Sequence, residues 1–190
     1  SGGPFLNMSS SQLKHVKLKE AIKHPNWQMG KKISIDSATM MNKVFEVIET
    51  QRIFHLEKSK IKILVYQQSY IHAIVEFKNG LKKILAHDTD MKIPIFNSIY
   101  ENSNKLYNSK KINIKKLNSL TFQNVNNKKF PLTKILNRFS NKCTLFETVL
   151  ISANDELVNL FLNNKISFGG TATKNVKKMI SNLKKEYKNK

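Results

Sequence analysis

The sequence predicts an α+β protein, in which a mixed α/β domain with an antiparallel strand element precedes a small α-helical domain. Three observations predict it. Apolar residues recur at helical spacing after Asp36, runs rich in Ile, Val and Tyr occupy residues 61–67 and 71–77, and the pattern from Phe130 onward is helical. We therefore expect a first domain at 1–100, a connecting segment at 101–128 and a helical C-terminal domain at 129–190.

The composition indicates a globular chain. Of 190 residues, 40% are hydrophobic, which is enough for one core or two small ones and argues against a disordered basic tail. No apolar run approaches the roughly 20 residues that a membrane helix needs. The single cysteine, Cys143, excludes an internal disulfide and a thiolate zinc site, and no leader sequence is evident. We expect a protein of a reducing compartment that is not secreted.

The charge is strongly positive, with 33 basic and 13 acidic residues and a net charge of +20. Such a balance is typical of nucleic-acid binding, because Lys and Arg release counterions from phosphates. However, only Arg52 and Arg138 are arginine, and Lys, Asn and Ile, all abundant here, share A/T-rich codons. The lysines are also spread along the chain. We do not expect nucleic acid to be the primary partner, although a basic nucleic-acid-binding module stays open as an alternative.

By these criteria the first hundred residues contain a turn, a short strand, a helix and a three-stranded element. Ser1-Gly2-Gly3-Pro4-Phe5 is a cluster of turn formers expected at the end of a strand. The β-branched run 33–35 predicts a short strand, and Asp36-Ser37 are good N-cap types for a helix after it. The buried stripe of that helix is expected to consist of Met41, Val44, Phe45 and Ile48.

Residues 61–67, 71–77 and 81–86 predict a three-stranded antiparallel element, with a hairpin turn at Lys78-Asn79-Gly80. The polar segment 101–128 predicts a long connection. Two amphipathic helices are expected after it, separated by Gly169-Gly170. Their apolar stripes are Leu157, Leu160 and Phe161 in the first and Val176, Met179, Ile180, Leu183 and Tyr187 in the second.

Three polar residues share the face of the first helix opposite its apolar stripe. With Met41 at 0°, Asn42 lies at roughly 100°, Glu46 at roughly 140° and Lys43 at roughly 200°. One interpretation is an ordinary solvated face with a Lys43–Glu46 ion pair. The other is an anion site, because hydroxyls and free backbone N–H groups at the helix N-terminus, together with Lys43, can hold a phosphate. Glu46 favours Mg²⁺ or Mn²⁺, but one carboxylate is not a complete metal site.

Four segments resemble a known enzyme family. The strings SGGPF, HPNWQMGKKISIDSATMMNK, SYIHAIVEF and DMKIPI are similar to those of 1-deoxy-D-xylulose 5-phosphate reductoisomerase. The resemblance implies an NADPH- and metal-dependent enzyme that makes 2-C-methyl-D-erythritol 4-phosphate in the non-mevalonate pathway of isoprenoid synthesis. It also implies a homodimer in a bacterial cytoplasm or a plastid-like organelle.

The resemblance also implies roles for individual residues. The family's catalytic groups correspond to Glu46, Lys43 and His24, with Glu46 as the metal ligand. Met29 and Gly30 correspond to positions beside NADPH, and Trp27 and Met29 to a lid over the substrate. The full set of implied substrate contacts is Ser1, His24, Ser37, Asn42, Lys43, Glu46, Trp27 and His72. From the residues alone, Trp27 is equally a core residue and His72 a structural histidine; His15, His55 and His87 match nothing and are expected at the surface.

The chain also departs from the family pattern. It matches only the latter half of the usual polypeptide, with no G-x-G-x-x-G and no Asp-Ser-Glu metal motif. We therefore expect a fragment, rather than a split half or a decayed gene product, that alone holds neither NADPH nor metal tightly and is inactive. Val44 replaces a small glycine, Ile151 replaces a polar residue, and the tail after Gly170 is short. A noncatalytic remnant stays open as a further alternative.

Overall fold

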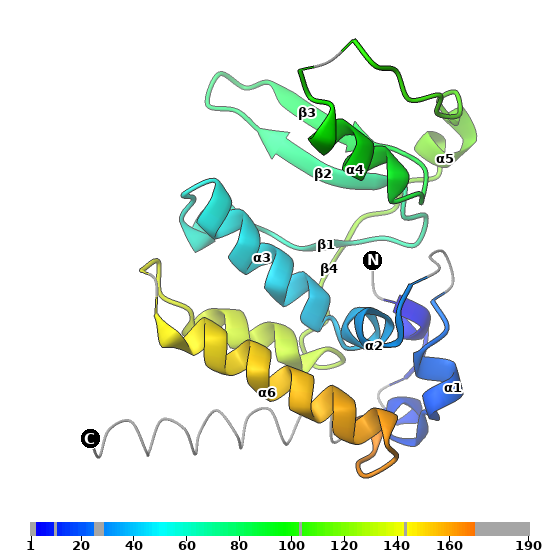
Figure 1. Ribbon diagram of the computed structural model, residues 1–190, viewed down its shortest axis with the longest axis vertical. Coiled ribbons are helices and arrows are strands. Elements are labelled where there is room, and N and C mark those ends of the chain that lie inside the picture. The colour runs from blue at the N-terminus through cyan, green and yellow to red at the C-terminus, as the bar shows by residue number, and fades with distance from the viewer. Residues whose placement is uncertain (1–2, 10, 25–28, 103, 143, 170–190) are drawn as a thin grey trace. The chain divides into compact units, whose positions relative to one another are not determined.

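A computed structural model describes residues 3–9, 11–24, 29–102, 104–142 and 144–169 (Figure 1). The α-helices are α1 (Leu18–Ala21), α2 (Lys31–Thr39), α3 (Met41–Ile53), α4 (Lys92–Ile99), α5 (Ile114–Asn118) and α6 (Leu145–Leu162). The 3₁₀-helices are η1 (Gly3–Phe5), η2 (Gln12–His15), η3 (Lys58–Lys60) and η4 (Pro131–Arg138). The strands are β1 (Leu64–Val65), β2 (Ile71–Glu76), β3 (Lys82–Ala86) and β4 (Gln123–Asn124). The predicted α+β class is confirmed.

The chain forms two compact units. The helical unit combines the described residues of 2–65 and 123–190, and the hairpin unit spans Tyr66–Phe122. The helical unit is therefore built from two stretches of sequence that flank the hairpin unit. The domain boundaries expected near residues 100 and 128 stay a prediction.

Helix α2 corrects the expected strand at 33–35. Gly30, in extended conformation, precedes the helix, and its carbonyl accepts from Ser34 N at 3.1 Å. Ile35 is completely buried while Ile33 is 41% exposed. Two β-branched residues, Ile33 and Ile35, are too few to outweigh the burial of one helix face. Asp36 and Ser37 therefore lie in the second half of α2 and cap nothing.

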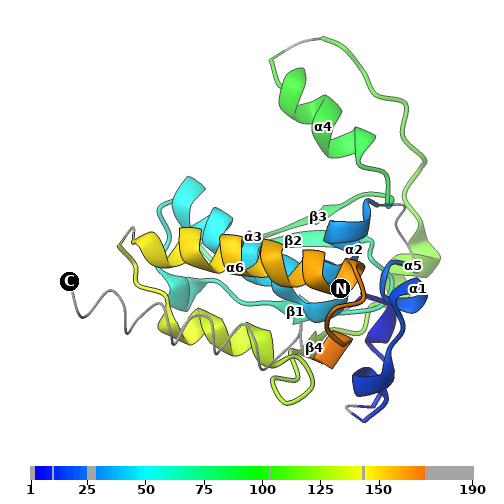
Figure 2. The same ribbon diagram turned by 60° about the horizontal axis from the view of Figure 1, so that its bottom comes forward.

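Helix α3 begins where α2 ends, after a left-handed residue, Met40 (φ 64°). Its predicted apolar stripe is confirmed. Met41 and Val44 are fully buried against side chains of η4 and α6, with Phe45 and Ile48 packed at the edge of the same cluster. Side chains of α3, η4 and α6 thus share one apolar cluster in the helical unit, whose elements Figures 1 and 2 show from two sides.

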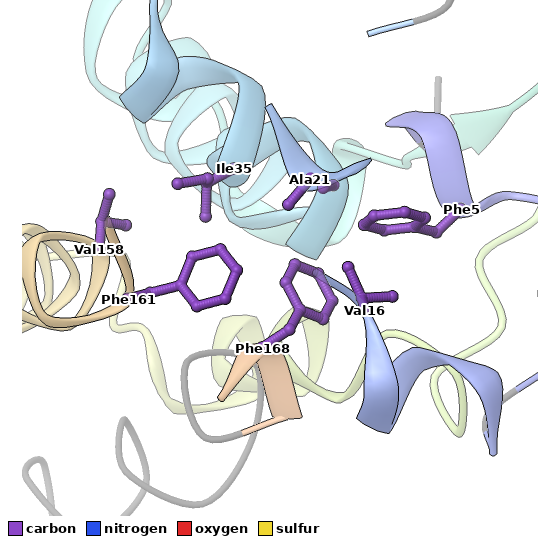
Figure 3. Close-up of a cluster of buried hydrophobic side chains, with 8 residues drawn as sticks. Phe5, Val16, Ala21, Ile35, Val158, Phe161 and Phe168 are labelled. Carbon is purple, nitrogen blue, oxygen red and sulfur yellow. The ribbon is translucent and has the colours of Figure 1, made fainter. Parts of the chain in front are cut away.

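A second apolar cluster joins the N-terminal segment to α2 and α6 (Figure 3). The rings of Phe5 and Phe161 each contact Phe168 edge to face, with centroids 5.1 and 5.7 Å away. The predicted stripe of Leu157, Leu160 and Phe161 is confirmed, since Phe161 is buried in this cluster and Leu157 in the first, with Leu160 packed against the first. However, α6 ends at Leu162, well before the expected stop at Gly169-Gly170. The second stripe, 176–187, lies outside the described residues.

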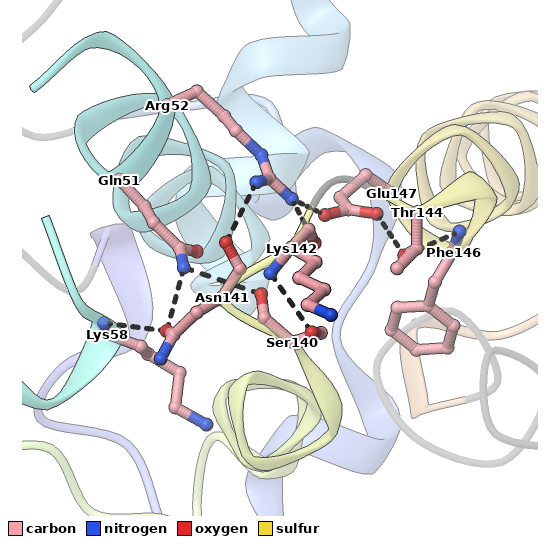
Figure 4. Close-up of polar contacts among 9 residues, drawn as sticks. All are labelled: Gln51, Arg52, Lys58, Ser140, Asn141, Lys142, Thr144, Phe146 and Glu147. Atoms are coloured by element: carbon pink, nitrogen blue, oxygen red, sulfur yellow. Dashed lines mark hydrogen bonds and ion pairs between the residues drawn. The ribbon is translucent and has the colours of Figure 1, made fainter. Parts of the chain in front are cut away.

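A set of polar contacts, which we call the polar bracket, connects Gln51 and Arg52 at the end of α3 with residues 140–147 around the start of α6 (Figure 4). Arg52 pairs with Glu147 and donates to Lys142 O at 3.0 Å. Gln51 Nε2 donates to Asn141 Oδ1 at 3.1 Å, and it is only 4% exposed. These bonds satisfy polar groups at the edge of the core and hold the two helices at fixed separation.

The three-stranded sheet expected at 61–86 is wrong. β2 and β3 form a two-stranded antiparallel hairpin, whereas β1 pairs with β4, with Leu64 opposite Asn124 and Val65 opposite Gln123. Ser69, at φ 50°, lies in the break between β1 and β2. Val65 is buried with Met40 and Phe130 in a small cluster of its own. Because the segment 101–128 includes α5 and β4, it is more than a connection.

Candidate functional site

The turn that opens the sequence lies directly against the last turn of α2. Gly3 has a left-handed φ of 59°, and a Cβ there would come within 2.8 Å of Ala38 Cα and 2.9 Å of Ser37 O. Only glycine permits this close approach of two backbones. The contact places η1 beside Ser37. Ser1, the expected substrate contact of this turn, lies outside the described residues.

The three polar residues predicted on one face of α3 are in direct contact. Lys43 Nζ lies 2.9 Å from Glu46 Oε1 and 2.6 Å from Oε2, and Asn42 Nδ2 donates to Oε1 at 2.7 Å. The side chains of Lys43 and Glu46 are 25% and 44% exposed. A partly exposed carboxylate with a lysine and an amide beside it is able to bind a cation through its oxygens and an anion through its neighbours.

Ser37 lies in a different setting from the one expected. It is 6% exposed, in the last turn of α2 rather than at a helix N-terminus, so the N–H groups of residues 36–39 are not the free donors that the sequence suggested. The helix start nearest to it is that of α3. The first-turn N–H groups of α3 belong to Met41, Asn42 and Lys43, and Met41 N already donates to Thr39 Oγ1 at 3.4 Å.

His24 lies near this cluster. Burial lowers its pKa, and the charge of Lys43 lowers it further, so the imidazole is neutral at pH 7. Gly30 is exposed, with nothing within 4 Å of the place where a Cβ would stand, and Met29 precedes it, half-buried. Trp27, the expected lid residue, lies outside the described residues. The structure thus brings Ser37, Asn42, Lys43, Glu46 and His24 into one unit.

His72 lies in the hairpin unit, on β2. Its ring stacks on that of His87, with centroids 3.6 Å apart and planes at 10°. His72 Nε2 donates to His87 O at 3.1 Å, because a carbonyl only accepts. His87, which the sequence left as a surface residue, is half-buried and orients this ring.

The sequence did not reveal a partly buried polar cluster between α2 and α6. Asn154 Nδ2 donates to Asp36 Oδ1 at 2.8 Å, and Lys32 Nζ lies 3.0 Å from both Asp36 Oδ2 and Asp155 Oδ1. The available signals were the i, i+4 spacing of Lys32 and Asp36 and the polar pair 154–155 within an apolar helix. Neither signal indicated that the two pairs meet.

Metal ligands are incomplete in the part of the chain that the structure describes. No three His, Cys, Asp or Glu side chains gather there as a metal site. Glu46 supplies one hard oxygen ligand of the kind that Mg²⁺ and Mn²⁺ prefer, so the donor chemistry fits but further ligands must come from elsewhere.

Among the described helices, none is long and apolar enough to span a membrane.

Two family models match the chain. Residues 1–54 match the 1-deoxy-D-xylulose 5-phosphate reductoisomerase C-terminal domain, and residues 87–190 match the DXP reductoisomerase C-terminal domain. The 1-deoxy-D-xylulose 5-phosphate reductoisomerase of Pelagibacter ubique is 59% identical over 168 residues, which are 88% of this chain and 43% of that protein. The apicoplastic enzyme of Plasmodium falciparum is 40% identical over 88% of this chain and 34% of its own length.

Solved structures give the same result. A DOX-P reductoisomerase in complex with NADPH, fosmidomycin and magnesium superposes with a TM-score of 0.82 at 34% identity, covering 94% of this chain and 44% of that one. The Zymomonas mobilis enzyme in complex with NADPH gives 0.81 at 32% identity, over 95% of this chain and 46% of its own. The chain thus spans less than half the length of these relatives.

Fold, site and matches together define the C-terminal part of a reductoisomerase. The chain belongs to the 1-deoxy-D-xylulose 5-phosphate reductoisomerase family, which confirms the resemblance noted in its sequence.

Proposed function

We propose that this chain is the substrate-binding C-terminal part of an enzyme that rearranges 1-deoxy-D-xylulose 5-phosphate and reduces the product with NADPH to 2-C-methyl-D-erythritol 4-phosphate, for isoprenoid synthesis by the non-mevalonate pathway. The observation that carries the proposal is the contact of Asn42, Lys43 and Glu46 on one face of α3, directly after the turn that contains Ser37. The 59% identity to a named reductoisomerase supports it.

The phosphate of the substrate is held by residues of α2 and α3. Ser37 and Asn42 donate hydrogen bonds to its oxygens, Lys43 supplies positive charge, and Ser1 adds a donor from the opening turn. This remote group contributes binding energy that orients the reacting carbons. His24 is neutral at pH 7 because of its lowered pKa, so it donates a hydrogen bond to the substrate without adding charge.

Glu46 contributes a carboxylate oxygen to the divalent cation, Mg²⁺ or Mn²⁺. When bound, the cation supplies Lewis acid chemistry to the carbonyl and hydroxyl oxygens of the substrate. Met29 and Gly30 would hold NADPH, and the absence of any atom within 4 Å of a Cβ at Gly30 would leave its backbone open to the cofactor. Trp27 covers the substrate and excludes water. His72 is proposed as a further substrate contact on the sequence resemblance.

A homodimer is proposed as the working assembly. The β2–β3 hairpin supports it, because Leu81, Ile84 and Leu85 are 63%, 58% and 58% exposed. Neither nucleic acid nor a membrane is proposed as a partner. The proposed location is a bacterial cytoplasm or a plastid-like organelle, which the bacterial and apicoplastic relatives support.

The proposal is tested with a chimera that joins this chain to the remaining N-terminal part of the Pelagibacter ubique relative. We expect the chimera to oxidise NADPH when given 1-deoxy-D-xylulose 5-phosphate and Mg²⁺, whereas the 190-residue chain alone does not. Glu46→Gln is expected to lower kcat/KM at least a hundredfold. The matched control is Glu49→Gln, which removes an exposed carboxylate from the same helix. A folded but inactive chimera would favour a noncatalytic remnant.

A further inference from the structure

Two neighbouring residues of α6 hold two residues of α2 that lie one turn apart. Asn154 contacts Asp36, and Asp155 pairs with Lys32, which also pairs with Asp36. Asp36 is 3% exposed and Asn154 1%. Burial raises the pKa of Asp36, and the hydrogen bonds from Asn154 and Lys32 oppose that effect. A buried carboxylate is tolerated only with such partners, so the helices meet in a specific way.

This contact sets the rotation of α2 about its own axis. The apolar contacts between the two helices, such as those of Ile35 with Val158 and Phe161, are non-directional, whereas a hydrogen bond specifies one orientation. Ser37 follows Asp36, roughly 100° further round the helix. Fixing Asp36 therefore also fixes the direction of Ser37. Only Met40 separates α2 from α3, so the orientation of α2 also affects the position of Asn42 in the first turn of α3.

We propose that Asn154 is a positioning residue, which acts through Asp36 to hold Ser37 in register for binding the phosphate of the substrate. The inference rests on the function proposed above. Phosphate recognition needs its donors held within about 0.5 Å of the productive geometry, and groups buried behind the site provide that precision. Asn154 does so from a helix that lies 118 residues away along the chain.

The test measures binding of inorganic phosphate to the 190-residue chain at constant ionic strength. Amide signals of Ser37, Asn42 and Lys43 in ¹H–¹⁵N spectra report on the site. In the wild-type chain we expect saturable shifts of these signals. Asn154→Ala is expected to weaken phosphate binding at least fivefold. Exchanging the pair, with Asp36→Asn and Asn154→Asp together, restores a donor and an acceptor and should return the affinity to within about twofold of wild type.

Gln51→Ala is the matched control. It removes another buried amide, 4% exposed, that bonds to Asn141 and Ser140 O from a position about 12 Å along α3 from Lys43. Both Asn154→Ala and Gln51→Ala should lower Tm, since each loses a buried hydrogen bond. Only Asn154→Ala should change the phosphate affinity beyond twofold. Equal affinities in the two variants would show that Asn154 is merely structural and would overturn the inference.

Lys32→Gln keeps the test decisive if Asn154→Ala does not fold. Its side chain is 47% exposed, so the substitution is compatible with folding, and loss of its two ion pairs should weaken phosphate binding by more than twofold, beyond the change in the Gln51→Ala control. An unchanged affinity contradicts the positioning role. If the Ser37 and Lys43 signals of the wild-type chain do not shift when phosphate is added, the phosphate site of the proposed function is contradicted. The positioning role is then contradicted as well.

Discussion

The helical unit and the hairpin unit bury their apolar residues to very different degrees. In the helical unit Ile35, Met41 and Leu132 are completely buried, and the buried pair Asp36 and Asn154 forms a hydrogen bond between residues far apart in sequence. In the hairpin unit Tyr70 and Ile71 belong to one small buried cluster, but Ile84 and Leu85, consecutive on β3, are each 58% exposed. Since consecutive side chains of a strand point to opposite faces, both faces of β3 contact water at this point. The site residues of α2 and α3 therefore lie on a well-packed support, whereas β3 leaves large apolar side chains exposed.

The largest expected contrast comes from truncating one apolar side chain in each unit. Phe161→Ala removes a ring packed against Phe168 and Val158 and should lower the free energy of unfolding by about 3–5 kcal/mol. Leu85→Ala, on the exposed ribbon, should cost less than about 1 kcal/mol. Urea denaturation of both variants measures the difference. Similar losses would contradict the claim that the two units differ in packing.

Two glycines with positive φ give the second contrast. Gly3→Ala places a methyl group within 2.8 Å of Ala38 Cα at a φ of 59°, so we expect a loss of about 2 kcal/mol or more. Gly80→Ala, at φ 86° with no neighbour within 4 Å, keeps the backbone strain without the clash and should cost about 1 kcal/mol. Thermal unfolding of the two variants separates steric overlap from strain. Equal losses would show that η1 yields to the added methyl.

Acid titration tests the polar bracket of the helical unit. Burial alone would raise the pKa of Glu147, but bonds from Thr144 and Arg52 outweigh it and lower the pKa below its usual value. Since the folded state holds this proton less tightly than the unfolded state, the carboxylate stabilises the fold above pH of about 4.5 and this stabilisation is lost as pH falls through the folded pKa.

Glu147→Gln removes this pH dependence. At pH 7 it should cost about 1–2 kcal/mol, because Arg52 loses a charged partner. As pH falls below about 4.5, the variant should lose less stability than the wild-type chain does. Denaturation at several pH values measures this. Glu76→Gln, at an exposed pair with Lys82, is the control and should leave the profile unchanged.

The sequence predicted the parts of this structure that depend on local spacing. The buried stripe of α3 and the face shared by Asn42, Lys43 and Glu46 follow from 3.6-residue periodicity alone. Helix α2 was missed because Asp36 and Ser37 are residue types favoured at N-caps, and only burial of Ile35 by α6 overrides that preference. The β1–β4 pairing and the Asp36–Asn154 bond join residues far apart in sequence, which single-sequence patterns do not encode.

The smallest expected effect on stability comes from substitutions on the exposed surface of the β2–β3 hairpin, and these also test the proposed role of that surface. Ile84→Ser and Leu85→Ser together should change the free energy of unfolding of a monomer by less than about 1 kcal/mol, because both side chains already contact water. If the ribbon is the surface that a second copy covers, the same double variant should abolish self-association in sedimentation experiments. Lys78→Ser, in the adjacent turn, should leave self-association intact. A chain that associates equally well with and without Ile84 and Leu85 would place the proposed dimer contact elsewhere.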